Sequence, residues 1–260
     1  MAGGTTGGDD VTRVDLHVKV LDEYVVERAK AAGIDALVYA PHFEHLDTIR
    51  ERAARFSDEE VLVVPGREYF TGTWANRKHV LAVDPDYPVP DFLPLEATMA
   101  ELHDQDTAVL APHPEFLTLS LDRGDISTYA DRIDAVEVYN PKHWPWDNER
   151  AREIARDSEL PTFISSYAHF RRTVGEAWVE LEHPVETADD LVAGLRAGVP
   201  RRMFHRKGLT HTLKCRAEFC HLGWENSWDK FERVVLNDLE PTNPNDPRYP
   251  DRFADLNAYR

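Results

Sequence analysis

Short apolar runs rich in β-branched residues alternate along this chain with segments of helical period. This alternation is typical of a parallel sheet wrapped by helices. Strands are predicted at residues 11–18, 36–40, 61–65, 79–83, 108–111, 135–139 and 162–165. Helices are predicted at residues 23–32, 46–56, 95–104, 148–157 and 188–197. Gly33 and Gly198 follow two of these helices, where a left-handed residue is favoured, and they support the helix boundaries.

The chain has 260 residues, a length at which α/β barrels are usually single domains. We therefore expect one barrel domain at residues 11–200. Residues 1–10 are rich in Gly, Thr and Asp and are predicted to be disordered. Residues 201–236 are predicted to form a C-terminal helical extension that packs on the barrel. Residues 237–260 carry four prolines among Asn and Asp, and we expect them to form an extended or wrapping tail.

The net charge is −17, from 47 acidic and 30 basic residues, of which only seven are lysine. Such a surface repels nucleic-acid phosphates and anionic membranes unless a local basic patch intervenes. It therefore disfavours a membrane as partner, and nucleic acid except as a nucleotide end. An acidic, lysine-poor surface also suits a salt-rich cytosol. We offer a halophilic source as a hypothesis, which greater stability in molar salt would support.

The chain contains no apolar run near the roughly 18–20 residues that span a bilayer, and its N-terminus has no apolar signal core. We therefore expect a cytoplasmic protein. Cys215 and Cys220 are too few for a disulfide framework and fit a reducing compartment. His211 and Cys215, four residues apart, could share a helix face and hold a structural zinc ion. Their spacing matches no common zinc module, so we favour packing of this segment against the barrel.

Five histidines and one glutamate lie at or near the ends of predicted strands. At or beyond the carboxyl ends of five strands lie His17, His42, Glu68, His113 and His169. In a parallel barrel these ends share one face, so the side chains converge there. His79 opens its own strand, which requires that strand to run the other way or the barrel to be distorted. Imidazole and carboxylate groups suit Zn, Mn or Fe, and we predict that these residues bind divalent metal ions.

Six short motifs follow one another along the chain. The first three are Asp15-Leu16-His17-Val18-Lys19, Ala40-Pro41-His42 and Gly66-Arg67-Glu68. The last three are His79-Val80-Leu81, Ala111-Pro112-His113-Pro114 and Ser166-Tyr167-Ala168-His169. Their order resembles the PHP family, named for polymerase and histidinol phosphatase, with its DLHxH, TDH, GxE, strand-borne His, His-Pro and SDAH motifs. The resemblance spans about residues 13–197 and rests on the order of the motifs, since each alone is weak.

The resemblance implies a distorted (β/α)7 barrel that holds up to three metal ions and hydrolyses phosphate esters with a metal-bound hydroxide. Carried over by position, Glu68, His79 and His113 resemble one complete metal site, in which Glu68 bridges to a neighbouring ion. His42 and His169 resemble two ligands of a second site. Asp22 or Glu23 could supply a further ligand there, and His45 could act in place of His42.

His17 matches one ligand of a third site, but its expected partners are replaced. The second His of DLHxH is Lys19, and the Asp of SDAH is Tyr167. A protonated ammonium cannot ligate a metal, and tyrosine binds most divalent ions less readily than a carboxylate. We therefore expect fewer than three ions. Lys19 is predicted to supply part of the missing positive charge, although both positions could also have drifted after activity was lost.

Three residues are predicted to act in catalysis: Glu68, Lys19 and Arg171. Arg171 and Arg172 follow His169, and a guanidinium there could bind the substrate phosphate in a bidentate manner or be solvated surface. Glu137 and Asn140 are expected to order the pocket. The expected substrate is a small phosphorylated metabolite or a nucleotide. The alternative is a PHP-like scaffold that has lost catalysis and binds a ligand or partner.

Overall fold

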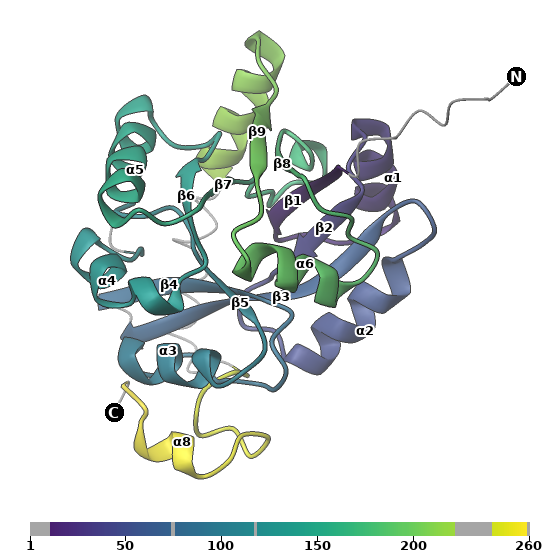
Figure 1. The fold of residues 1–260 in the computed structure, drawn as a ribbon. Coiled ribbons are helices and arrows are strands. Elements are labelled where there is room, and N and C mark those ends of the chain that lie inside the picture. Colours follow the sequence, from purple (N-terminus) through teal and green to yellow (C-terminus); the bar gives the residue numbers. More distant parts are fainter. Residues whose placement is uncertain (1–10, 74–75, 117–118, 222–240, 259–260) are drawn as a thin grey trace, which may run out of the picture.

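The computed structural model of the protein describes residues 11–73, 76–116, 119–221 and 241–258. One sheet curls into a nearly closed barrel, and helices lie around its outside (Figure 1). The strands are β1 (Thr12–Val18), β2 (Ala36–Tyr39), β3 (Leu62–Thr73), β4 (Asn76–Val83), β5 (Ala108–Ala111), β6 (Ala135–Tyr139), β7 (Thr162–Ile164), β8 (Ala177–Leu181) and β9 (Arg201–His205). The expected distorted α/β barrel is confirmed.

Strand direction explains how the polar residues converge. The sheet order is β7-β6-β5-β4-β3-β2-β1-β8-β9. β1, β2 and β3 pair in parallel, as do β5, β6 and β7. β4 is antiparallel to both β3 and β5, so of the two alternatives for His79 the structure shows a strand that runs the other way. β7 also contacts β1, β8 and β9, which brings the two ends of the sheet together.

The helices around the barrel are α1 (Glu23–Ala32), α2 (Leu46–Phe56), α3 (Leu95–His103), α4 (Arg123–Thr128), α5 (Pro145–Ser158) and α6 (Ala188–Arg196). The sequence pattern predicts all of them except α4, which has six residues and is too short to show a helical period. α1 begins at Asp22, whose side chain accepts a hydrogen bond from the Val25 amide, and ends at Gly33 with φ 73°. Among the described residues, no helix is long and apolar enough to cross a membrane.

β3 is longer than predicted, and this corrects the position of Glu68. The predicted strand ends at Pro65, whereas β3 continues to Thr73 because residues 66–73 form an antiparallel hairpin with β4. Glu68 therefore lies within a strand rather than beyond its end. Gly66 permits the close packing at this point, since a Cβ there would lie 2.6 Å from Cγ1 of Val38.

The sheet gains β8 and β9, which the sequence pattern does not predict. β8 pairs antiparallel with β1, and β9 pairs antiparallel with β8. β9 reads Arg-Arg-Met-Phe-His and is largely exposed, so it carries no apolar run that would reveal it. The helical extension expected from residue 201 therefore begins after this strand, and residues 209–221 are helical. The remainder of that extension and the predicted disorder of residues 1–10 lie outside the described residues.

Residues 241–258 lie against the outside of the barrel next to α3 (Figure 1, yellow). They form turns and the short helix α8 (Arg252–Asp255) rather than an extended segment. The hydroxyl of Thr242 donates a hydrogen bond to the buried carboxylate of Asp91. Tyr249 and Phe253 are buried in the main hydrophobic core. A few apolar residues are therefore enough to hold residues 241–258 in place, because they pack on the core of the barrel.

Candidate metal centre

Glu68 lies at the centre of a buried cluster of histidines. Its carboxylate is fully buried, and four imidazole rings from other segments approach it. Nδ1 of His79 lies 3.0 Å from Oε1, and Nε2 of His113 lies 2.9 Å from the same oxygen. Nε2 of His17 lies 3.2 Å from Oε2, and Nε2 of His42 lies 3.1 Å from it. The structure thus brings five of the six predicted metal ligands together.

The hairpin and two strand ends position these rings. Glu68 and Phe70 point to the same face of β3, and Phe70 pairs with His79 on β4, so His79 reaches the carboxylate diagonally. His113 follows β5 with φ 34°, a left-handed conformation that is uncommon for a residue other than glycine. The carboxylate of Glu137 accepts a hydrogen bond of 2.7 Å from the His113 amide and holds this turn.

The protonation of the cluster suits a divalent cation. Burial lowers the pKa of His17 to about 3 and lowers the pKa of His42 and His79 as well. Burial alone would raise the pKa of Glu68, but attraction to the Lys19 ammonium opposes it, and the pKa lies well below its usual value. Neutral imidazoles around an anionic carboxylate are the protonation states that metal ligation requires.

The geometry also fits a metal ion. One ligand atom each from His42, Glu68 and His79 lie within 4.8 Å of one another. The far nitrogens of the rings, Nδ1 of His17, Nδ1 of His42 and Nε2 of His79, have no hydrogen-bond partner within the described part of the chain. Each ring is therefore held by packing and by its contact with Glu68 alone, and its far nitrogen is not committed to a protein partner within the described residues. His42, Glu68, His79 and His113 are the residues that could hold it.

Lys19 adds a cation to the cluster. Its ammonium forms an ion pair with Oε2 of Glu68 and donates a hydrogen bond of 2.6 Å to the carbonyl of Ala40. Burial lowers the pKa of Lys19 to about 8, although the attraction of Glu68 opposes this shift. One oxygen of the carboxylate therefore already has a positively charged partner.

His169 lies at the edge of the cluster, with Tyr167 next to it. Tyr167 has φ 47°, and its ring centroid lies 4.8 Å from that of His17 and 5.2 Å from that of His113. Nδ1 of His169 lies 3.1 Å from the carbonyl oxygen of Tyr167. Because a carbonyl only accepts, Nδ1 carries the proton and Nε2 keeps its lone pair for a ligand. Among the described contacts, no hydrogen bond or ion pair joins His169 to Glu68.

One family model matches part of the sequence. It is PHP_C, described as PHP-associated, and it matches residues 145–200, which run from α5 through α6. Residues 145–200 are thus similar to a segment that is associated with PHP domains. No curated protein matches the sequence.

Two solved structures resemble this chain in fold. PsfC from Pseudomonas syringae has a TM-score of 0.58 at 20% identity, and the match covers 82% of this chain and 99% of PsfC. The lesion-specific endonuclease PfuEndoQ from Pyrococcus furiosus has a TM-score of 0.53 at 14% identity, with 74% of this chain and 57% of the endonuclease covered. At these identities the likeness concerns the fold alone.

The predicted phosphate-binding residue Arg171 does not touch the histidine cluster. It lies in a short 3-10 helix, Arg171–Thr173, and its Nε lies 2.6 Å from the carboxylate of Asp22. Its side chain is 64% exposed. Asp22 caps α1, and neither Asp22 nor Glu23 makes a described contact with Glu68. Exposed pairs of this kind are weak, so Arg171 remains available to a ligand.

Two buried charged residues that the sequence does not single out, Lys142 and Glu218, hold the loop that carries His169. Oε1 of Glu218, on the helix of residues 209–221, accepts hydrogen bonds of 2.6 Å from the amides of His169 and Phe170. The ammonium of Lys142 lies 3.2 Å from Oε2 of Glu218 and donates to the carbonyls of Ser166 and Tyr167. Lys142 follows the end of β6, as other candidates follow their strands. No sequence signal marks Glu218, because its partners are 48 and 49 residues away.

Proposed function

We propose that this protein is a metal-dependent phosphoesterase that hydrolyses the phosphate ester of a small metabolite or a nucleotide. The observation that carries the proposal is the buried Glu68 carboxylate, with four imidazole nitrogens 2.9–3.2 Å from its oxygens. This donor set suits Zn, Mn or Fe. One structural neighbour is described as a lesion-specific endonuclease, so cleavage of a phosphoester is a chemistry that the fold supports.

A divalent ion bound here would lower the pKa of a water molecule and neutralise charge on the phosphoryl oxygens. Glu68, His79 and His113 would hold such an ion, with His17, His42 and His169 around the same site. The ammonium of Lys19 is fixed on Glu68 and adds a positive charge toward a phosphoryl group. Because Lys19 occupies one carboxylate oxygen, we expect fewer than three ions.

A second candidate is a scaffold that has lost catalysis and binds a ligand or partner. The ion pair between Lys19 and Glu68 favours it, since the ammonium already neutralises the carboxylate without a metal. The two functions differ in metal content and in rate.

The test is metal analysis by mass spectrometry of protein purified without a chelating column, together with hydrolysis of p-nitrophenyl phosphate and bis(p-nitrophenyl) phosphate. The phosphoesterase should contain one or two equivalents of metal and lose its rate on chelation. Glu68→Gln is the matched control, because it keeps the shape of the side chain and removes its charge. If the protein contains no metal and hydrolyses neither ester, the phosphoesterase is refuted and the scaffold that binds a ligand or partner remains.

A further inference from the structure

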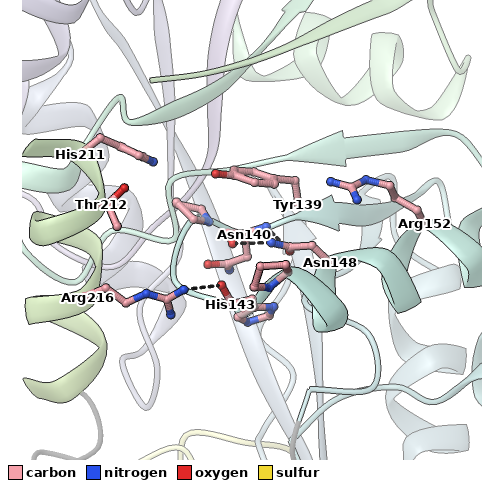
Figure 2. Close-up of a pocket in the computed structure, with 10 residues that line it drawn as sticks. Tyr139, Asn140, His143, Asn148, Arg152, His211, Thr212 and Arg216 are labelled. Carbon is pink, nitrogen blue, oxygen red and sulfur yellow. Dashed lines mark hydrogen bonds between the residues drawn. The ribbon is translucent and has the colours of Figure 1, made fainter. Parts of the chain in front are cut away.

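A pocket of about 250 Å³ lies beside the candidate metal centre, between the β6–α5 segment and the helix of residues 209–221. Figure 2 shows His211, Thr212 and Arg216 on that helix, facing Asn140 and His143. Pockets for whole drug-sized ligands are usually about 300 Å³ or larger. This one therefore has room for a small group rather than for a large molecule.

The charge of the lining is opposite to that of the protein. Arg152, Arg216, His143 and His211 line the pocket, and among the described residues no Asp or Glu does. The chain as a whole has a net charge of −17. An anion repelled by most of this surface would thus meet an attractive site here.

Arg216 is the arginine of the lining that has no carboxylate partner among the described residues. Arg152 pairs with Glu149 at 2.9 Å, and His211 lies 2.6 Å from Glu176, whereas no described carboxylate pairs with Arg216. Its guanidinium donates to the carbonyls of Lys142 and His143, at 3.2 and 3.4 Å, and lies 4.0 Å from the ring centre of Trp144.

These contacts fix the orientation of Arg216 but use only part of its hydrogen-bonding capacity. A guanidinium has five N–H donors, so the two hydrogen bonds within the described residues leave three for a ligand. A planar, oriented guanidinium matches a carboxylate or phosphate with two parallel hydrogen bonds.

His143 connects this pocket to the metal centre. Its ring is buried, stacks on Phe116 at 3.8 Å and lies 6.2 Å from the ring of His113. Its Nε2 has no hydrogen-bond partner in the described part of the chain. Asn140 and Asn148 join through two hydrogen bonds, of 2.9 and 3.1 Å, which keep the floor of the pocket rigid (Figure 2).

We propose that this pocket binds a small oxyanion, a carboxylate or a second phosphate, at the far end of the substrate whose phosphoester lies at the Glu68 cluster. That the anion belongs to a substrate rests on the proposed phosphoesterase function. The binding of an anion in this pocket does not. It names the substrate class as a small phosphoester with two anionic ends.

The first experiment measures binding by calorimetric titration with malonate and, separately, with inorganic phosphate. Arg216→Ala should weaken the binding of the preferred anion by about tenfold or more, because a charge-assisted contact is lost. Arg206→Ala is the matched control, since Arg206 also donates to a carbonyl, that of Gly175, and lies over a tryptophan, Trp178, outside the pocket. It should bind both anions as the wild type does.

Arg216→Lys keeps the charge without the planar fork and should give an intermediate loss, which guards against failure of Arg216→Ala to fold. The anion whose affinity depends on Arg216 identifies the far group as carboxylate or phosphate. Equal affinities in the wild type, Arg216→Lys and Arg216→Ala, with all three folded by thermal melting, would overturn the site.

The second experiment compares phosphate monoesters of hydroxy acids of increasing length with monoesters of uncharged alcohols of the same lengths. For one length the carboxylate should lower KM, and Arg216→Ala should raise KM for that ester more than for the uncharged ester of the same length. Hydrolysis without any carboxylate advantage would refute the role of the pocket in substrate binding. No hydrolysis of any ester, with anion binding that depends on Arg216, would instead refute the phosphoesterase and retain the anion site.

Discussion

The ammonium of Lys19 lies on the carboxylate of Glu68, where both groups are buried at the centre of the histidine cluster. In the PHP motif pattern the position of Lys19 is a histidine that ligates a metal. A lysine ammonium therefore pairs with the carboxylate at a position where the pattern has a metal-ligating histidine. The pattern also has an aspartate at the position of Tyr167, which carries no carboxylate. Substitutions at Lys19 and Tyr167 test whether this ion pair takes the place of one metal site.

Lys19→Ala should leave a buried carboxylate without its cation. Removing one partner of a buried pair costs about 3–5 kcal/mol, so the metal-free variant should melt at a lower temperature than the wild type. Added Mn²⁺ or Zn²⁺ should recover much of this loss, and phosphate binding or turnover should fall. Differential scanning calorimetry with and without metal measures this. An unchanged melting temperature and unchanged turnover would show that Lys19 contributes to neither stability nor activity.

The double change Lys19→His with Tyr167→Asp should restore the missing ligands and add one metal equivalent. The expected gain follows because both positions lie near His17: the ring of Tyr167 lies 4.8 Å from that of His17, and Lys19 pairs with the Glu68 oxygen that His17 approaches. Metal titration of the wild type, Lys19→His and the double variant tests the idea. A stoichiometry that stays constant across the three proteins would contradict it.

Glu68→Gln and His113→Ala should each abolish phosphoester hydrolysis and lower metal content at the same time. A neutral amide ligates cations poorly, and an alanine removes a ring that lies 2.9 Å from the carboxylate. We expect a fall in rate of at least about a hundredfold. Glu180→Gln, which alters only a surface pair with Arg13, is the control. Full turnover in a folded Glu68→Gln protein would refute the assignment.

Arg171→Ala should raise KM and leave the metal content unchanged, because Arg171 lies outside the histidine cluster and pairs with Asp22. Arg172→Ala, at the neighbouring exposed position, is the control and should change neither quantity. Steady-state kinetics and metal analysis of both variants check this. A loss of bound metal in Arg171→Ala would count against a role in substrate binding.

Glu218→Ala should loosen the loop that carries His169. It leaves two amides without their acceptor and the buried ammonium of Lys142 without its carboxylate partner, and we expect a loss of about 3–5 kcal/mol in the free energy of unfolding. Glu218→Gln keeps one oxygen for the amides and should cost less. Urea denaturation gives the stability, and hydrogen exchange at the amides of His169 and Phe170 reports the loop directly. Unaltered exchange in Glu218→Ala would show that other contacts hold this loop.

The reactivity of the two cysteines should depend on pH in different ways. Burial raises the pKa of Cys215 to about 11, so only about one thiol in a thousand is ionised at pH 8. Cys220 is exposed and free. A thiol reagent at pH 8 should therefore modify Cys220 alone, and Cys220→Ser should remain almost unmodified until the pH rises. Rapid labelling of both cysteines at pH 8 would contradict the burial of Cys215.

Most of the fold could be predicted from local patterns, and the failures have identifiable causes. α1, α2 and α3 begin within a residue of their predicted starts, because capping residues and apolar spacing act within a few residues of the chain. β9 has no apolar run, and the continuation of β3 past Pro65 depends on pairing with β4. Pairing partners of that kind lie outside the window in which a local pattern is read.

The sequence by itself determined the alternation of strands and helices and the placement of His17, His42, His113 and His169 at or beyond strand ends, since these depend on residue type and spacing. Only the tertiary structure decided that Lys19 pairs with Glu68, that Arg216 faces a pocket without carboxylates, and that Glu218 supports the loop of His169. Each of these contacts joins residues more than forty positions apart. Side chains so distant come into contact only where the nearly closed sheet and the helix of residues 209–221 bring them together. Local propensity carries no information about such contacts.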